Sequence, residues 1–105
     1  MINAKIFRDL SGKIIGFTVE NHGESVVCAA VSMLVLNTVN GIGLFTEDTF
    51  DFDCDENDGG YLTFSLTEPS SRTDSIGILL DTMFLGLMCA KEEYPDEIEI
   101  IEIRV

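Results

Sequence analysis

The chain has 105 residues, of which 46% are hydrophobic, so it can bury one modest core but has no room for a second. Six basic and 19 acidic residues give a formal net charge of −13. This balance argues against direct binding of nucleic acid, because phosphate contacts require a basic surface, and it favours a basic protein partner. On charge alone, the acidity could equally serve solubility.

The composition also bears on compartment and cofactors. The first nine residues lack the apolar region of a signal peptide, and the longest apolar stretch, Val26–Leu36, is interrupted by Ser32 and is too short to span a bilayer. Three scattered cysteines (Cys28, Cys54 and Cys89) fit reduced thiols better than disulfides. With one histidine and no CxxC pair, we expect no metal and no cofactor. We therefore predict a cytoplasmic protein that does not bind membranes.

The first 20 residues alternate between apolar and polar side chains, which predicts two strands. Asp9–Gly12 supplies the turn between them, so the strands are expected to pair as a hairpin. The second strand leads into a polar loop that contains the only histidine, His22. A loop held between rigid elements is a common place for a catalytic group.

A strongly apolar segment follows and is predicted to form a helix over about 24–40, ending at Gly41 or Gly43. Ser25 is the predicted N-cap, which places Cys28 at the third helical position. Apolar residues cover most of the helix circumference, so we expect this helix to be buried at the centre of the fold.

The segment 49–55 alternates cleanly and is predicted to pair with 61–66 across a turn at Asn57–Gly60. Cys54 falls on the same side as two phenylalanines, so we expect a packed thiol. The aspartates on the other side do not form a calcium loop, because the required glycine and glutamate positions hold other residues.

A second helix is predicted from about Ser71, its expected cap, to Tyr94, where the following proline stops it. Cys89, near the end of this helix, is expected to pack on an apolar wall and to be unreactive. A last strand is expected at 98–105. The predicted fold is therefore α+β in the order ββαββαβ, with two helices packed against a mixed or antiparallel sheet.

His22 and Cys28 are the candidate catalytic residues. The exposed N–H groups and positive dipole end of a helix favour a thiolate over a thiol, and a loop histidine can fold back over a helix start. The alternative is an inert buried cysteine beside an ordinary surface histidine, and spacing alone favours that interpretation.

The residues around this pair resemble the ribosomal-processing cysteine protease (Prp) family. The resemblance rests on His22-Gly23, then Val27-Cys28-Ala29-Ala30-Val31-Ser32 and a long apolar helix, with Leu85-Gly86-Leu87 and Tyr94-Pro95 in matching places. It covers nearly the whole chain and implies a single Prp-like domain over 1–105. The chain departs from the family in having Asn21-His22-Gly23 where Gly-His-Ala is usual. Its loop to the cysteine is also shorter, and Ser25 stands where an acidic residue is expected.

The resemblance implies a bacterial, dimeric enzyme that removes an N-terminal extension from a basic protein of the large ribosomal subunit. Cys28 would be the nucleophile and His22 the general base and acid, with backbone N–H groups at the helix start as oxyanion donors. The residue that orients His22 stays open among Glu20, Asn21 and Glu24. The alternative is a non-catalytic acidic dimer that binds a basic ribosomal protein as an assembly factor.

Overall fold

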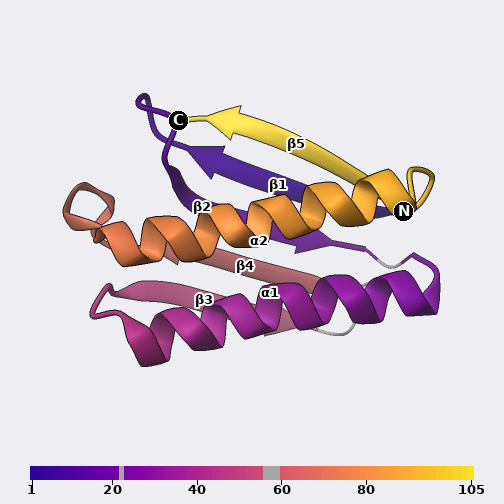
Figure 1. Ribbon diagram of the computed structural model, residues 1–105, viewed down its shortest axis with the longest axis horizontal. Coiled ribbons are helices and arrows are strands. Elements are labelled where there is room, and N and C mark those ends of the chain that lie inside the picture. The colour runs from indigo at the N-terminus through magenta and orange to yellow at the C-terminus, as the bar shows by residue number, and fades with distance from the viewer. Residues whose placement is uncertain (22, 56–59) are drawn as a thin grey trace.

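Five strands form one sheet, and two long helices cover one of its faces (Figure 1). The computed structural model describes residues 1–21, 23–55 and 60–105. His22 and most of the predicted turn at Asn57–Gly60 lie outside these described residues. The predicted order is confirmed, as β1 (Ile2–Arg8), β2 (Ile14–Glu20), α1 (Ser25–Phe45), β3 (Phe50–Asp55), β4 (Tyr61–Leu66), α2 (Asp74–Glu93) and β5 (Ile98–Arg104), with a short 3-10 turn at Pro69–Ser71.

The sheet is mixed, with strands in the order β3-β4-β2-β1-β5. Strands β1 and β5 are parallel, while the other neighbouring strands are antiparallel. The parallel pair arises because α2 crosses back over the sheet before β5 begins, as parallel strands require (Figure 1). The two edges of the sheet are therefore β3, which follows α1, and β5, which follows α2.

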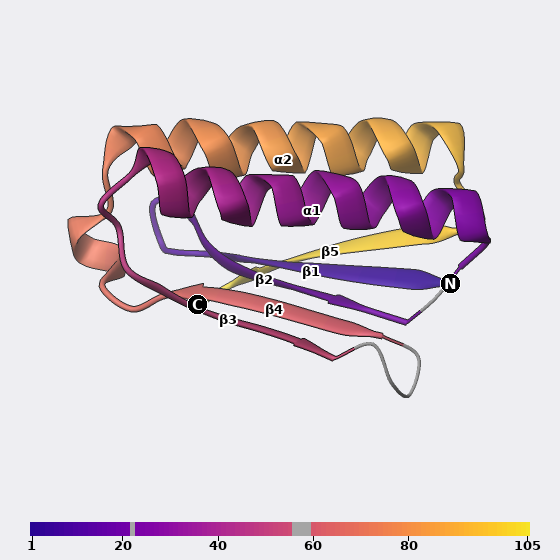
Figure 2. The same ribbon diagram turned by 90° about the horizontal axis from the view of Figure 1, so that it is seen from below.

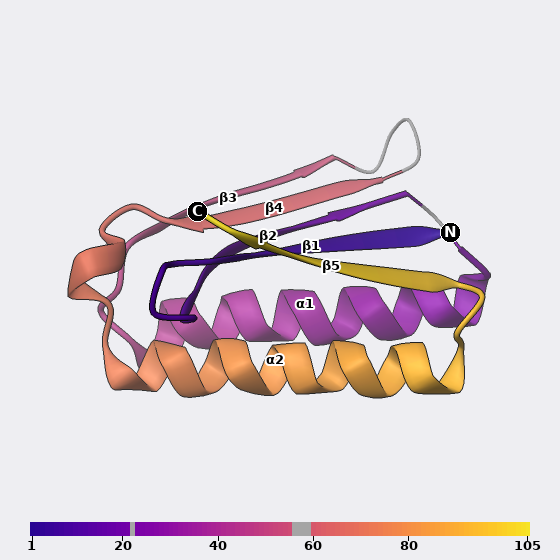
Figure 3. The same ribbon diagram turned by 90° about the horizontal axis from the view of Figure 1, so that it is seen from above.

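Both helices lie on the same face of the sheet, and the opposite face is uncovered (Figures 2 and 3). The helices run antiparallel, so the start of α1 lies at the same end of the layer as the end of α2. Between the layers, the inward-facing residues of the central strands meet one row from each helix. The rings of Phe17 and Phe64 stack there with centroids 5.0 Å apart, and Ile6 and Leu80 are fully buried.

The prediction that α1 is buried at the centre of the fold is wrong. α1 is half of an outer layer, so it buries one row against the sheet and leaves the other side open. Met33 and Leu44 on that side are 71% and 77% exposed. The helix also continues to Phe45, because Gly41 and Gly43 keep helical geometry. Its last turn is closed where the N–H of Thr46 donates to the carbonyl of Ile42 at 3.1 Å.

By length and composition alone, α1 is apolar enough to cross a bilayer, with a mean hydropathy of 1.8 over 18 residues. Because α1 is continuous over 21 residues, its length does not argue against a membrane span, contrary to the expectation from the shorter apolar stretch Val26–Leu36. A helix from the core of a globular protein passes the same test, and α1 has a row of side chains packed in the core, namely Val27, Val31, Val35, Val39 and Ile42. Packing, not length, is what distinguishes α1 from a membrane span.

Both helix starts lie one or two residues from the predicted caps. The carboxylate of Glu24, not Ser25, caps α1 and accepts from the N–H groups of Val26 and Val27 at 3.1 and 3.4 Å. Cys28 is therefore the fourth helical residue, not the third. Thr73, and not the predicted serine, caps α2.

The two cysteines that were expected to be packed are both exposed. Cys54 lies near the end of the edge strand β3, where the inward-facing phenylalanines Phe50 and Phe52 are themselves only partly buried. Cys89 lies on the side of α2 that faces away from the sheet, between the buried Leu87 and the helix end. The predictions failed because an apolar neighbourhood in sequence does not say which side of a two-layer fold is covered.

Candidate active site

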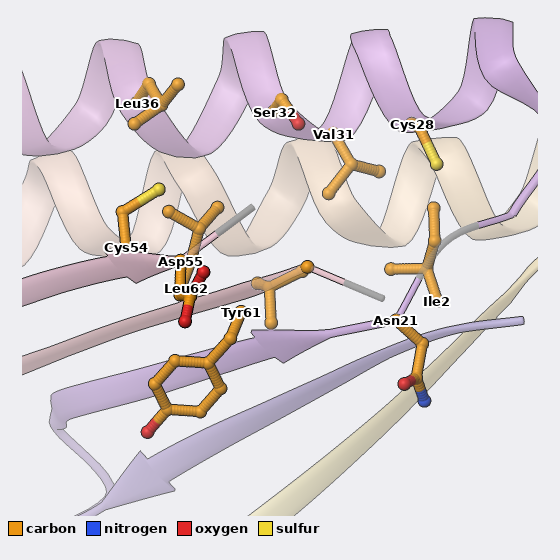
Figure 4. Close-up of a pocket in the computed structure, with 12 residues that line it drawn as sticks. Ile2, Asn21, Cys28, Val31, Ser32, Leu36, Cys54, Asp55, Tyr61 and Leu62 are labelled. Carbon is orange, nitrogen blue, oxygen red and sulfur yellow. The ribbon is translucent and has the colours of Figure 1, made fainter. Parts of the chain in front are cut away.

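A cavity of about 310 Å³ opens between the first half of α1, the end of β3 and the start of β4 (Figure 4). Most of its lining is apolar, with a few polar groups from the helix, the strands and the segments that join them. It is lined by Ile2, Val19, Asn21, Cys28, Val31, Ser32, Leu36, Cys54, Asp55, Gly60, Tyr61 and Leu62. Within the described part of the chain, no three His, Cys, Asp or Glu side chains are grouped to hold a metal ion. The cavity has the character of a site for an organic ligand.

Cys28 lies at one end of this cavity, with its sulfur pointing away from α1 towards Ile2 (Figure 4). The side chain is half-buried. The N–H of Gly23 donates to the Cys28 Sγ at 3.0 Å, and as a thiol the sulfur can donate back to the Gly23 carbonyl at 3.5 Å. On ionisation the second contact is lost, but the first becomes a charge-assisted hydrogen bond. Gly23 therefore contacts the thiol directly, and its N–H can donate to a thiolate.

The predicted partner of Cys28, His22, lies outside the described residues. Its described neighbours on both sides are held in place. The N–H of Asn21 donates to the Gly60 carbonyl at 3.1 Å, and Gly23 contacts the sulfur. Asn21 has a φ of 71°, a left-handed conformation that asparagine tolerates, and this turns the chain from β2 towards α1. The pairing of His22 with Cys28 stays a prediction.

The three candidates for orienting His22 are in different surroundings. The carboxylate of Glu20 lies 3.9 Å from Lys5 Nζ, in an ion pair between β1 and β2. The carboxylate of Glu24 is the cap of α1. Asn21 lines the same cavity as Cys28. Two of the candidates are thus engaged elsewhere, and Asn21 lines the cavity with its amide pointing away from Cys28 (Figure 4).

The expected oxyanion donors at the start of α1 are largely occupied. The N–H groups of Val26 and Val27 donate to Glu24 Oε2, and that of Cys28 donates to the Glu24 carbonyl at 2.9 Å. Among the residues that the structure describes, the Ser25 N–H has no acceptor. The Glu24 cap therefore leaves one backbone donor open at this helix start.

Sequence reasoning missed Glu97, which precedes β5. Its Oε2 accepts from the N–H of Glu24 at 2.8 Å, across a separation of 73 residues. No local pattern could have indicated this contact. It follows from the topology, which places the end of α2 and the start of β5 beside the start of α1.

Solved structures that are similar over nearly the whole chain include a protease, which places the protein in the class of hydrolases that cleave peptide bonds. One is a crystal structure of the essential ribosomal processing protease Prp from Staphylococcus aureus with a covalently linked product peptide. It is 27% identical with a TM-score of 0.88, and the match covers 97% of this chain and 99% of that one. A second, SMU.848 from Streptococcus mutans, is 26% identical with a TM-score of 0.87, and the match covers 100% and 99% of the two chains.

The sequence comparison identifies the family within this class. The family described as Cysteine protease Prp matches residues 1–99. A curated relative, the ribosomal processing cysteine protease Prp of Staphylococcus aureus (strain Mu50), is 28% identical over 106 aligned positions, covering 95% of this chain and 97% of the relative. The chain belongs to the Prp family of cysteine proteases.

Proposed function

We propose that this protein is a processing protease that removes the N-terminal extension of a large-subunit ribosomal protein, with Cys28 as nucleophile and His22 as general base and acid. The observation that carries the proposal is the Cys28 thiol at the start of α1, facing a cavity and accepting the Gly23 N–H at 3.0 Å. The substrate is inferred from relatives, since the Staphylococcus aureus relative is named a ribosomal processing protease. A cytoplasmic location is part of the proposal.

The chemistry follows from these residues. His22 takes the proton of Cys28, and the thiolate attacks the carbonyl carbon of the scissile peptide bond. The C–N bond then breaks, His22 returns the proton to the leaving amine, and a thioester to Cys28 remains. Water hydrolyses the thioester and releases the carboxylic acid. The Ser25 N–H is the available backbone donor for the oxyanion formed in each step.

The cavity and the surface charge support a particular kind of substrate. Val31, Leu36 and Leu62 line the cavity and favour an apolar side chain close to the scissile bond. Asp55 is at the same cavity, and the net charge of −13 attracts a basic chain. The same charge opposes direct binding of ribosomal RNA.

The test is cleavage of the large-subunit ribosomal protein of the same organism, produced with its N-terminal extension. We expect the wild type to cleave it, and Cys28→Ala and His22→Ala to leave it intact. Cys54→Ala is the matched control, because Cys54 lines the same cavity, and it should retain cleavage. Cleavage by Cys28→Ala would place the nucleophile elsewhere. Stable binding without cleavage by the wild type would favour the assembly-factor alternative.

We also propose that the protein forms a homodimer through the outer side of α1. None of the 21 residues of α1 is charged, although the chain carries a net charge of −13. A charge-free surface suits a second copy, because two equally acidic molecules repel each other elsewhere. Val26, Met33 and Leu44 supply the exposed apolar side chains of this surface.

The dimer is tested by molar mass from light scattering. Met33→Asp should convert the dimer to a folded monomer, because it places a charge on the α1 surface. Leu10→Asp is the control, since Leu10 is 81% exposed in the β1–β2 turn, and it should stay dimeric. A monomeric wild type, or a Met33→Asp variant that stays dimeric, would rule out this interface.

A further inference from the structure

We propose that Glu97 is a positioning residue that holds the loop residues Gly23 and Glu24, which precede α1, against the Cys28 sulfur. The proposal rests on the proposed function of Cys28 as nucleophile. Glu97 does not touch the sulfur, and it acts through Gly23 and Glu24. Three features support it: a rigid backbone at Glu97, a hydrogen bond to the loop, and a close approach that only glycine allows.

The backbone of Glu97 is fixed on both sides. Its N–H donates to the Tyr94 carbonyl at 3.1 Å, and its carbonyl accepts from the N–H of Ile2 at 2.8 Å. These bonds tie Glu97 to the end of α2 and to the start of β1. The half-buried side chain therefore extends from a part of the molecule that is held by the sheet and a helix.

The side chain of Glu97 reaches from this anchor to the loop. Its Oε2 accepts from the N–H of Glu24 at 2.8 Å, a charge-assisted hydrogen bond to the residue that caps α1. Through Glu97, Glu24 is thus tied to the sheet as well as to α1.

Glu97 Oε2 also lies close to Gly23, the residue that precedes Glu24. A Cβ atom added to Gly23 would lie 2.7 Å from Glu97 Oε2 and 3.3 Å from Ile2 Cγ1. Only glycine lets the carboxylate approach this closely. Gly23 is also the residue whose N–H donates to the Cys28 Sγ, so the position of Glu97 determines where that donor lies.

A small displacement of this donor matters for catalysis, because misplacing a group by about 1 Å can cost about 100-fold in rate. If Glu97 withdraws, the loop loses its tie to the sheet and the N–H of Gly23 moves away from the sulfur. The thiolate is then less stabilised, so reaction of Cys28 requires a higher pH.

The experiment measures alkylation of each cysteine by iodoacetamide as a function of pH, resolved by peptide mass spectrometry. We expect Glu97→Ala to slow Cys28 by about 10-fold near neutral pH and to shift its profile to higher pH. Glu97→Gln should stay close to wild type, because its amide oxygen can still accept from Glu24. Glu99→Ala is the control, since Glu99 is exposed on β5 and carries the same charge.

The pH profile separates positioning from simple charge. If the negative charge of Glu97 were what mattered, Glu97→Ala and Glu97→Gln would shift together to lower pH, because removing an anion favours a thiolate. Glu97→Asp keeps the charge but withdraws the carboxylate, so it should resemble Glu97→Ala and serves if the alanine variant does not fold. Thermal unfolding of each variant establishes that the fold is intact.

Gly23→Ala offers an independent route to the same contact. Its methyl group must displace the Glu97 carboxylate, so it should slow Cys28 alkylation on its own. Combined with Glu97→Ala, it should add little, because both changes break one contact.

Wild-type rates in both Glu97→Ala and Glu97→Asp would overturn the positioning role. A different result would overturn the proposed function itself: equal alkylation of Cys28, Cys54 and Cys89 in the wild type. The two failures are therefore distinguishable in one data set.

Discussion

Cys28 and Cys89 lie towards the same end of the helical layer, because the two helices run antiparallel (Figures 2 and 3). Cys28 is half-buried in the first turns of α1 and accepts the N–H of Gly23. Cys89 is exposed in the last turns of α2, where the helix dipole is negative and disfavours a thiolate. Cys89 is thus the more accessible of the two thiols, but it lies where the helix dipole disfavours its ionised form. The backbone N–H that donates to the sulfur, rather than exposure of the thiol, identifies the candidate nucleophile.

The largest expected effect comes from exchanging these cysteines for alanine. Cys28→Ala should abolish cleavage, whereas Cys89→Ala should leave it unchanged. Since Cys89 and Cys54 are both exposed, their alanine variants should change the free energy of unfolding by no more than about 0.5 kcal/mol. Cleavage assays and urea titrations measure the two quantities. A loss of cleavage in Cys89→Ala, with the fold intact, would remove the distinction between the two sites.

The caps of the two helices provide the next comparison. Glu24→Ala and Thr73→Ala each remove a side-chain acceptor from a helix start and should cost about 1 kcal/mol of stability. Only Glu24→Ala should also change the alkylation rate of Cys28, because only α1 carries the cysteine. Urea titrations give the stability, and iodoacetamide gives the rate. Equal effects of both variants on Cys28 would mean that global stability, not the α1 cap, controls the thiol.

The order of elements could be predicted from the sequence because each element has its own periodicity. Alternation over Ile2–Arg8 and Phe50–Asp55, and helical spacing in α2, are local properties of the chain. The burial of α1 could not be predicted in the same way. An apolar circumference is compatible with a central helix or with an outer helix that has a second interface, and only the layer arrangement decides between them.

Part of the site could also be predicted from the sequence. The position of Cys28 near a helix start follows from the polar loop and the apolar segment after it. The sequence favours Ser25 as the cap because its hydroxyl can accept from a free N–H of the first turn, but the longer carboxylate of Glu24 reaches such donors from one residue earlier. The role of Glu97 could not be predicted, because only the tertiary structure brings it to Glu24, which is 73 residues away in the sequence.

A smaller effect would isolate the contribution of the helix dipole from that of the loop. Ser75→Cys places an exposed cysteine in the first turn of α2, with no loop wrapped over it. The dipole should favour its thiolate by roughly 0.3–1 kcal/mol, or about two- to five-fold in alkylation rate over Cys89. Alkylation of both residues in the same molecule gives the ratio. If Ser75→Cys reacts as fast as Cys28, the Gly23 donor adds nothing.

The smallest expected effect concerns Asp9, where donors also gather around an anion. Its Oδ1 accepts from the Ser11 hydroxyl at 2.7 Å and from the N–H groups of Ser11 and Lys13 at 2.9 and 3.0 Å. These hydrogen bonds, that from the Ser11 hydroxyl foremost, lower the pKa of Asp9 below its ordinary value of 3.8. The effect is the expected response of a carboxylate that accepts several hydrogen bonds.

A lowered pKa in the folded state fixes the sign of the pH dependence. The contribution of Asp9 to stability is complete above its unfolded-state pKa and is lost as the pH falls through the lower folded-state value. The difference in free energy of unfolding between wild type and Asp9→Asn should therefore be constant near neutral pH and shrink in acid. Ser11→Ala removes the main donor, so the loss should begin at a higher pH, closer to 3.8. Urea titrations over the acid range measure both, and a difference that does not change with pH would show that the turn does not stabilise the carboxylate.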